Sequence, residues 1–335
     1  SDLYEESFFS QISDWCARNG ISFSGHLLLE DDIRLHTVFE GNFFSLLRHM
    51  HFPGIDMLQS IPSMLCHSDF AFTPKLVSSV ARAYNRPHVM SEVSAHAQGG
   101  KVTHDQMYAS LCAQYALGVD IFTYYYGERF MDPETYTKYN HALGRIDNLM
   151  AGRTVADALL YYPIETMQMH HRPSDAQYGT YTEAENACKL NLMAIQNTLL
   201  DNQIDFDYAD YDVLSRMTVC EDGTLLSPNG YRYASLILPP MEYTPAMANL
   251  LSDTAAWGNV IRVGEDSTPI SEIPDLLTRR ALTAEGATHG VLRLVRDTEN
   301  GRACLLVNTN EEATAVTFTI AGMTAPVLYD PFADA

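Results

Sequence analysis

Helical and strand-like patterns of apolar residues alternate over the first 150 residues. The helical stretches carry apolar residues every three or four positions, and short apolar runs bounded by turn residues lie between them. Gly20 and Gly118 are expected to end two of the helices, and Thr73 with Pro74 to open another. The expected helices are 3–19, 43–50, 73–84, 103–117 and 132–150, and the expected strands are 21–29, 53–58, 87–93 and 119–127.

Strands regularly separated by helices predict a parallel sheet, so the expected fold class is α/β. A second unit of the same kind runs to about residue 265, and its pattern favours a doubly wound, flavodoxin-like domain. From about Gly290, two alternating runs flank a Glu-Asn-Gly turn and a third run follows, which predicts an antiparallel β segment too short for a complete sandwich. In the second unit we expect strands at 155–163, 204–210, 233–240 and 259–264, and helices at 182–202 and 244–257.

Polar residues follow every strand of the first unit. In parallel α/β folds, functional groups gather at the carboxyl ends of the strands. The residues at these ends are His26 and Glu30 after the first strand, Asp56 after the second, Glu92 and His96 after the third, and Tyr124, Tyr125 and Tyr126 at the fourth. The sequence therefore predicts one polar cluster at this edge of the sheet.

The charge balance excludes a class of partners. The 335 residues include 21 Lys and Arg against 42 Asp and Glu, a formal net charge of −21. Nucleic-acid binding draws on many cationic side chains, so we expect no nucleic-acid partner. Hydrophobic residues make up 46% and charged residues 19%, which is ordinary for a globular chain of two or three domains. Most of the acids are expected to be solvated surface.

Cysteine usage and motifs exclude several further classes. The six cysteines lie far apart and without zinc-ligand spacing, so we expect buried free thiols and a reducing, cytoplasmic location. No apolar run is long enough to span a membrane, and the N-terminus lacks the pattern of a signal peptide. Neither GxGxxG nor GxxxxGK[ST] nor HExxH occurs, so we expect no cofactor.

Two segments carry a resemblance to known enzymes. The sequence RPHVMSE at 86–92 is similar to the seventh-strand motif of family 42 β-galactosidases and family 106 α-L-rhamnosidases, which ends in a catalytic or substrate-binding glutamate. The junction GRIDNLMAGRTVADALLYYP at 144–163 resembles the passage from the barrel to the following domain in the same families. The likeness covers most of the chain and implies a glycoside hydrolase.

The resemblance also implies a domain plan. The four strands of the first unit then correspond to strands 5 to 8 of a TIM (β/α)8 barrel, which normally takes about 250 residues. We therefore expect the C-terminal half of a barrel at 1–152, a flavodoxin-like α/β domain at 153–285 and an incomplete β-sandwich at 286–335. We further expect the chain to be a piece of a longer enzyme.

Glycoside hydrolysis generally needs two carboxyl groups. Glu92 is our first candidate for nucleophile or general base, because it ends an apolar strand at the expected pocket mouth and matches the family motif. In family 42 the acid/base follows strand 4, which would precede this chain. Glu30 and Asp56 are the candidates for the second carboxyl within it, and each could equally be a helix-capping or solvated acid.

Other residues at the same edge are candidates for substrate binding. His26 and His96 could hydrogen-bond sugar hydroxyls, although a lone histidine is more often structural, and Tyr125 could stack on a sugar face. No metal site is expected; a hard cation such as Ca²⁺ near Glu30 and Asp31–Asp32 is the weaker alternative.

The sequence thus predicts a glycoside hydrolase that removes a terminal sugar from a glycan. The alternative is a non-catalytic or catalytically incomplete carbohydrate-binding or structural fragment of such an enzyme, since half the barrel is missing. The expected partners are a carbohydrate substrate and, because exposed strand edges favour pairing, a second copy of the chain.

Overall fold

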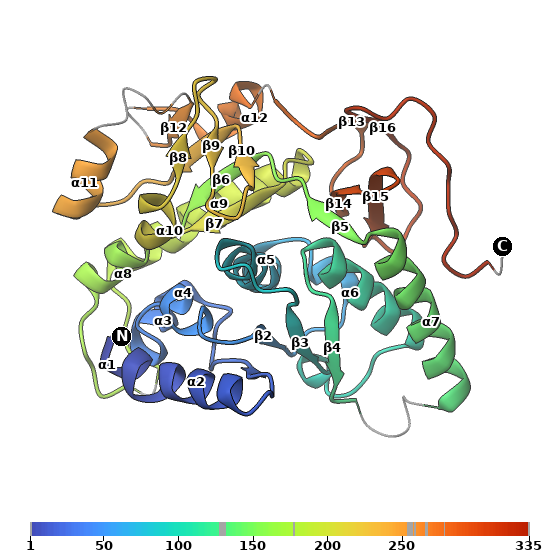
Figure 1. Ribbon diagram of the computed structural model, residues 1–335, viewed down its shortest axis with the longest axis horizontal. Helices are drawn as coiled ribbons and strands as arrows, with labels where there is room; N and C mark the ends of the chain where they lie inside the picture. Colours follow the sequence, from blue (N-terminus) through green and yellow to red (C-terminus); the bar gives the residue numbers. More distant parts are fainter. Residues whose placement is uncertain are drawn as a thin grey trace.

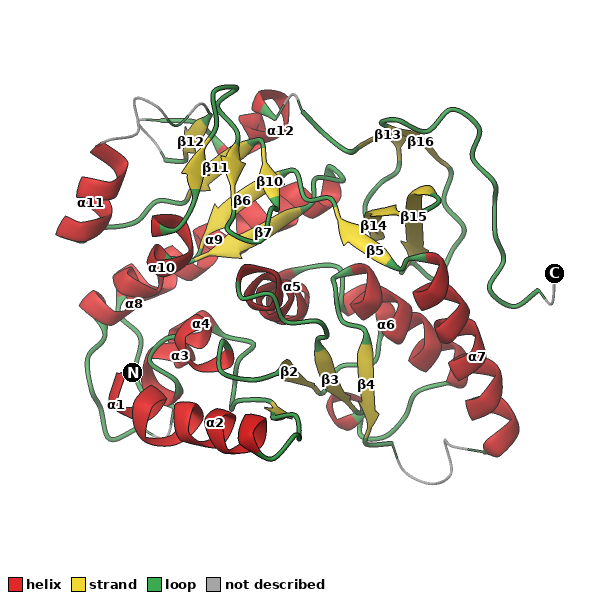
Figure 2. Cartoon of the chain, in the orientation of Figure 1, coloured by secondary structure: helices red, strands yellow, loops and turns green. Residues whose placement is uncertain are grey.

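Two parallel sheets lie on either side of one long helix in the computed structural model (Figure 1). The model describes residues 2–126, 132–176, 178–252, 257, 259–264, 267–277 and 279–333. The helix between the sheets is α5 (Ser68–Ala83), which packs against a strand of each. Figure 2 shows the same alternation of helices and strands along the chain that the apolar pattern predicts.

The first sheet has four parallel strands in chain order, as in half of a barrel. These strands are β1 (Ser24–Gly25), β2 (Phe52–Met57), β3 (Met90–Val93) and β4 (Ile121–Tyr124). The helices of this part are α1 (Asp2–Tyr4), a π-helical segment (Glu5–Ser10), α2 (Gln11–Arg18), α3 (Ile33–Phe39), α4 (Phe43–Leu47), α5, α6 (His104–Ala116) and α7 (Pro133–Leu149). The predicted α/β class and half-barrel sheet are confirmed.

The second sheet is also parallel, with the order β12-β11-β6-β7. Numbered along the chain within this sheet, the strands stand in the order 4-3-1-2. The strands are β6 (Ala158–Tyr161), β7 (Phe206–Ala209), β11 (Ser235–Leu238) and β12 (Val260–Arg262). The helices are α8 (Ile164–His170), α9 (Glu183–Asp201), α10 (Tyr211–Ser215), α11 (Pro245–Ser252) and α12 (Ile273–Leu276).

The remaining strands form antiparallel sheets. The turn at Glu299–Asn300 joins two paired strands as predicted, but the third predicted run pairs with an earlier strand and not with its neighbour. The first strand of this group, β5, includes residue 152, where the boundary between the first two domains was expected. It pairs with β14. The sheets are β15-β14-β5 (Gly301–Asn308, Val291–Thr298, Gly152–Thr154), β13-β16 (Leu282–Gly286, Val316–Ile320) and β10-β9-β8 (Arg232–Tyr233, Leu225–Leu226, Thr218–Val219).

Helix caps explain where several predicted helices begin. The side chains of Thr103 and Thr182 each accept a hydrogen bond from the backbone N–H three residues later. The side chains of Gln106 and Glu185 in turn accept hydrogen bonds from the backbone N–H groups of these two threonines. Such capping boxes satisfy two backbone donors and stabilise a helix start by about 1 kcal/mol. Asp132 caps α7 with its side chain alone, which accepts a hydrogen bond from the backbone N–H of Thr135.

Two predicted boundaries are wrong. The expected strand at 21–29 has only two residues in the sheet, because the chain leaves the sheet after Gly25 and turns at Leu29, whose φ is 62°. The helix expected to open at Thr73 and Pro74 begins five residues earlier, at Ser68. Pro74 lies inside it, and the Thr73 hydroxyl donates to the Asp69 carbonyl one turn back.

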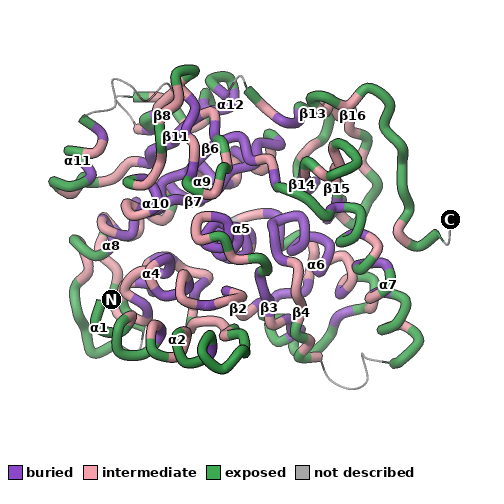
Figure 3. The backbone as a smooth tube through the Cα atoms, viewed as in Figure 1, coloured by how far each residue is buried: buried purple, intermediate pink, exposed green. Residues whose placement is uncertain are grey.

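The core includes α5, α6, β2, β3 and the second parallel sheet, and Figure 3 shows buried stretches in the middle of the molecule around α5 and α6. The six cysteines are free thiols, and four of them are buried, as predicted.

The segment after β16 runs along the outside with Val327 and Leu328 almost fully exposed. Among the described residues, no helix has the length and apolar character needed to cross a membrane.

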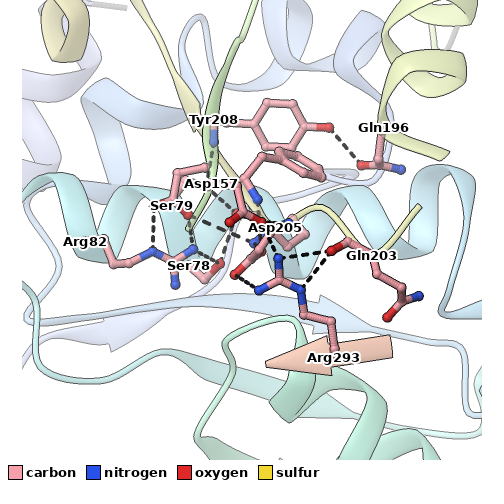
Figure 4. Close-up of polar contacts among 12 residues, drawn as sticks. Ser78, Ser79, Arg82, Asp157, Gln196, Gln203, Asp205, Tyr208 and Arg293 are labelled. Atoms are coloured by element: carbon pink, nitrogen blue, oxygen red, sulfur yellow. Dashed lines mark hydrogen bonds and ion pairs between the residues drawn. The ribbon is translucent and has the colours of Figure 1, made fainter. Parts of the chain in front are cut away.

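Buried ion pairs connect helix α5 and strand β14 to the second sheet (Figure 4). Lys75 Nζ on α5 lies 2.6 Å from Asp205 Oδ1, and Arg82 on the same helix pairs with Asp207 on β7. Arg293 on β14 pairs with Asp157, which precedes β6. These acids are not the solvated surface residues expected for most of the 42, because each meets a cation from a distant segment. We call these six residues the junction network.

Candidate functional site

Strand register places Asp56 and Glu92 side by side at the carboxyl edge of the first sheet. Asp56 on β2 pairs with Glu92 on β3, which pairs in turn with Thr123 on β4. Residues in register on neighbouring strands point to the same face, so the two carboxyl groups lie on one side of the sheet. Ile55 and Ser91, which precede them, are fully buried, whereas Asp56 and Glu92 are only partly buried.

Glu30 joins this pair from the turn between β1 and α3. Its Oε1 atom accepts a hydrogen bond of 2.7 Å from the backbone N–H of Asp56. The Glu30 side chain is 3% exposed, and burial raises the pKa of its carboxyl to about 8, with the charges of Asp56 and Asp31 acting in the same direction. The Glu30 carboxyl therefore keeps its proton at neutral pH.

His26 lies between Glu30 and Glu92. Its Nδ1 is 4.0 Å from Glu30 Oε1, and its Nε2 is 3.8 Å from Glu92 Oε2. The Nδ1 atom also lies 2.7 Å from the Leu27 carbonyl, which can only accept, so Nδ1 carries the hydrogen and donates it there. The other nitrogen, Nε2, faces the Glu92 carboxylate. One imidazole ring thus separates the two glutamates.

Asp56 has an unusual environment for an aspartate. Burial and the nearby Glu92 charge raise its pKa, and they outweigh the opposite effects of His26 and His96. Its Oδ1 atom is buried and has no hydrogen-bond partner among the described residues. A buried acceptor without a partner costs free energy, which a hydrogen-bond donor that reached this oxygen would offset.

An aromatic pair stands beside the carboxyl groups. The His96 ring, in the 3-10 turn His96–Gln98 after β3, stacks on Tyr125 after β4 with 5.7 Å between ring centroids and 26° between planes. Tyr125 is 62% exposed and His96 is exposed as well. Flat exposed rings of this kind can pack against the apolar face of a sugar.

The structure thus brings together all six residues predicted from the sequence: His26, Glu30, Asp56, Glu92, His96 and Tyr125.

Asp32, in contrast, is a helix cap. It accepts from the backbone N–H of Arg34, pairs with the side chains of Arg34 and Lys189, and has a pKa lowered to about 2 by these partners against the effect of burial.

Sequence reasoning missed Glu40 and His36. Glu40 is buried just after α3, its two carboxyl oxygens have no hydrogen-bond partner in the described part of the chain, and burial and the charge of Glu30 raise its pKa. His36 Nε2 lies 2.9 Å from the Glu30 carbonyl and its Nδ1 lies 2.5 Å from the Tyr162 hydroxyl. No local sequence signal marks Glu40, because its burial depends on segments that meet only in the fold.

A broad cleft lies elsewhere, between α6, α7, β15 and the segment 322–332. None of the six predicted residues lines it. Its wall is largely apolar, with residues such as Ile146, Leu305 and Val327. The polar cluster at the edge of the first sheet is therefore separate from this cleft.

Comparison with known proteins shows the fold. No family model and no curated protein matches the sequence. Among solved structures, a rhamnosidase from Novosphingobium sp. PP1Y matches with a TM-score of 0.65 at 15% identity over 95% of this chain and 34% of that one. An exo-carrageenase of glycoside hydrolase family 42 from Bacteroides ovatus matches with a TM-score of 0.58 at 10% identity over 96% of this chain and 52% of that one.

The chain therefore spans between a third and about half of the length of these two structures. The expected resemblance to a rhamnosidase and to family 42 glycoside hydrolases is confirmed at the level of the fold.

Proposed function

We propose that this chain is part of a glycoside hydrolase that removes a terminal sugar from a glycan. One observation carries the proposal: a protonated glutamate and a partly exposed glutamate, Glu30 and Glu92, flank one imidazole at the carboxyl edge of parallel strands. Glycoside hydrolysis uses two carboxyl groups, one that donates a proton and one that acts as nucleophile or base. The fold shared with glycoside hydrolases supports the same reaction class.

In the proposed reaction, Glu30 is the proton donor. With a pKa of about 8 it holds a proton at neutral pH and transfers it to the oxygen that links the sugar to its leaving group. Glu92, in register with Asp56, either attacks the anomeric carbon or removes a proton from an attacking water. The His26 Nδ1–H donates to the Leu27 carbonyl, and this contact orients the ring so that Nε2 lies 3.8 Å from Glu92 Oε2.

Asp56, His96 and Tyr125 are proposed to bind the sugar. The unpartnered Asp56 Oδ1 accepts a hydrogen bond from a hydroxyl group, and the stacked pair of His96 and Tyr125 covers an apolar sugar face. The second sheet is proposed to be a flavodoxin-like domain, since its order begins as that fold does. The edge strands β1 and β4 each pair with one strand only in the described part of the chain, which supports association with a second copy.

One observation favours a second function. Glu30 is 3% exposed, so a proton donor at this position has little access to a substrate in the described structure. The chain would then be a carbohydrate-binding or structural part of an enzyme whose proton donor lies outside it. This alternative keeps the roles of Asp56, His96 and Tyr125 but gives Glu92 no chemical step.

The experiment is a screen of aryl glycosides, including β-galactosides and α-rhamnosides, with the chain and its Glu92→Gln variant. We expect hydrolysis of at least one substrate and a fall in kcat of about 10²–10⁴-fold in the variant, because the carboxylate is lost without a change of shape. Glu242→Gln is the matched control, since Glu242 is also paired with a histidine but is exposed and distant in the fold.

Wild-type kcat in Glu92→Gln would rule out the catalytic role of this residue. If the chain hydrolyses no glycoside, the glycosidase proposal fails for this chain. Titration calorimetry with galactose and rhamnose then tests the binding alternative, which requires saturable binding that is weakened in a Tyr125→Ala variant.

A further inference from the structure

Three metal-ligating side chains from three different segments meet at one point of the described structure. His67 directly precedes α5, Asp201 is the last residue of α9, and His289 lies in the turn between β13 and β14. One ligand atom of each residue lies within 4.8 Å of the others. This cluster is distinct from the acids at the edge of the first sheet, and we call it the His–Asp–His cluster.

Both histidines face the same carboxylate oxygen. His67 Nε2 is 2.9 Å and His289 Nδ1 is 3.1 Å from Asp201 Oδ1, and the two rings are stacked with 4.5 Å between centroids. Bonds of 2.0–2.2 Å in a tetrahedral zinc site place neighbouring ligand atoms about 3.3 Å apart. Asp201 Oδ1 therefore needs to move away from each nitrogen by only a few tenths of an ångström to admit a metal ion, and all three ligand atoms already lie within 4.8 Å of one another.

The contacts of His67 set its tautomer. Its Nδ1 lies 2.9 Å from the sulfur of Cys66, and that sulfur lies 3.1 Å from the Ser63 carbonyl. Since the carbonyl can only accept, the thiol donates its hydrogen there, and the sulfur is left to accept from Nδ1–H of His67. When His67 is neutral in this tautomer, its Nε2 has a lone pair that can bond to a metal ion next to Asp201. Metal-bound histidines are commonly fixed through their other nitrogen in this manner.

In the absence of a metal ion, a proton lies between His67 Nε2 and Asp201 Oδ1. Without a metal, each imidazole must donate an N–H to the shared oxygen, so His67 has hydrogen on both nitrogens and is charged. A divalent metal ion supplies the same positive charge between the two rings and bonds to both nitrogens.

We propose that His67 Nε2, Asp201 Oδ1 and His289 Nδ1 hold a divalent transition metal ion of the zinc type, with the fourth position open to water. Binding releases one proton from His67 Nε2 and forms a bond from that nitrogen to the metal. Two histidines with one carboxylate form an accepted ligand set for such ions. The metal ion would tie together α5, α9 and the β13–β14 turn.

The backbone around the cluster is already held in place. Asn310 Nδ2 donates to the His289 carbonyl at 2.9 Å, and Gln203 Nε2 donates to the Val291 carbonyl at 2.7 Å. The site is also open to an ion from solution, because the His289 side chain is 73% exposed. A largely preformed, accessible site loses little free energy to ordering when the ion binds.

The test is titration of chelator-treated chain with Zn²⁺ by calorimetry near pH 7, in two buffers of different ionisation enthalpy. We expect one Zn²⁺ per chain, release of about one proton, and a rise in Tm with added Zn²⁺. His289→Ala should weaken binding at least about 10-fold and remove the rise in Tm. This exposed position allows the variant to fold.

His88→Ala is the matched control. His88 Nδ1 lies 3.0 Å from Asp120 Oδ2, a similar pair without the second imidazole, so this variant should bind Zn²⁺ as the wild type does. The proposal is overturned if the wild type shows no stoichiometric binding, or if His289→Ala binds as tightly as the wild type. It also fails if His88→Ala loses the ion.

Discussion

Acidic residues at the carboxyl edge of the first sheet and acidic residues in the junction network have opposite electrostatic surroundings. Glu30 and Asp56 lie near other acids and have raised pKa values, although histidines are close by. Burial also acts on Asp205, but Lys75 and Arg293 outweigh it and lower the pKa of this residue. Burial alone therefore does not distinguish the two regions. At Asp205 the cations outweigh burial, whereas at Asp157 burial outweighs Arg293 and the pKa is raised.

This difference separates structural acids from candidates for chemistry. An acid paired with a buried Lys or Arg stays ionised. It contributes to the stability of the fold because it compensates the charge of its buried partner. An acid without such a partner can hold and release a proton near neutral pH, which is the property that proton-transfer catalysis needs. The following predictions test this distinction, beginning with the largest expected effect.

Removal of one cation from the junction network should be strongly destabilising. Arg82→Met leaves the buried Asp207 carboxylate without its main partner, and we expect the free energy of unfolding to fall by about 3–5 kcal/mol. Chemical denaturation at pH 7 measures the change. The double variant Arg82→Met/Asp207→Asn should recover part of the loss, because no uncompensated charge remains.

Arg279→Met provides the control for this change. Arg279 and Asp222 form an exposed pair, and such pairs contribute about 0–1 kcal/mol. Equal losses in Arg82→Met and Arg279→Met would show that the junction network does not depend on buried charge.

Glu30→Gln should change the pH dependence of stability. Because the pKa of Glu30 is raised by folding from 4.5 to about 8, the wild type loses stability as pH rises through this range, and the loss is complete above pH 8. Gln cannot ionise but can still accept from the Asp56 N–H. The wild type should lose roughly 3–4 kcal/mol of stability between pH 5 and pH 8 through this group, and the variant should not show this loss.

Urea unfolding of both proteins at several pH values measures this difference. Other groups titrate in both proteins, so only the difference between them reports on Glu30. Two parallel stability curves would show that Glu30 ionises without a penalty, and its proposed role as proton donor at neutral pH would then be lost.

Asp56→Asn should have the smallest effect. It removes a negative charge that raises the pKa of Glu30 but keeps the backbone N–H that Glu30 accepts. We expect the pH-dependent loss of stability to be complete at a lower pH than in the wild type. At pH 8 the free energy of unfolding should exceed that of the wild type by no more than about 1 kcal/mol. The same urea series measures it, and a shift of the loss to higher pH would contradict the arrangement described here.

The local parts of this fold could be predicted because their causes lie close together in the sequence. Thr103 with Gln106 and Thr182 with Glu185 are capping boxes within four residues, so the helices they begin were correctly expected. The two-residue length of β1 was not, because the chain leaves the sheet at a turn that contains Leu29 in a left-handed conformation. Nothing in the apolar pattern of 21–29 marks this turn.

The candidate site was predictable for a related reason. Parallel strands bring their carboxyl ends to one edge, so acids that follow successive strands, such as Asp56 and Glu92, meet whatever the details of packing. Glu40 could not be found in this way. It follows a helix, and its place beside Glu30 depends on how α3 packs in the completed fold.

The sequence by itself determined the alternation of helices and strands, the parallel sheet and the acids at its edge, since these depend on periodicity and on neighbours a few residues apart. Only the tertiary structure decided which acids have cations as partners and which do not. Arg82 meets Asp207, and His67 meets Asp201 and His289, across more than a hundred residues of chain. Proton affinity and metal binding depend on distances of a few ångströms between such groups, and only folding sets these distances.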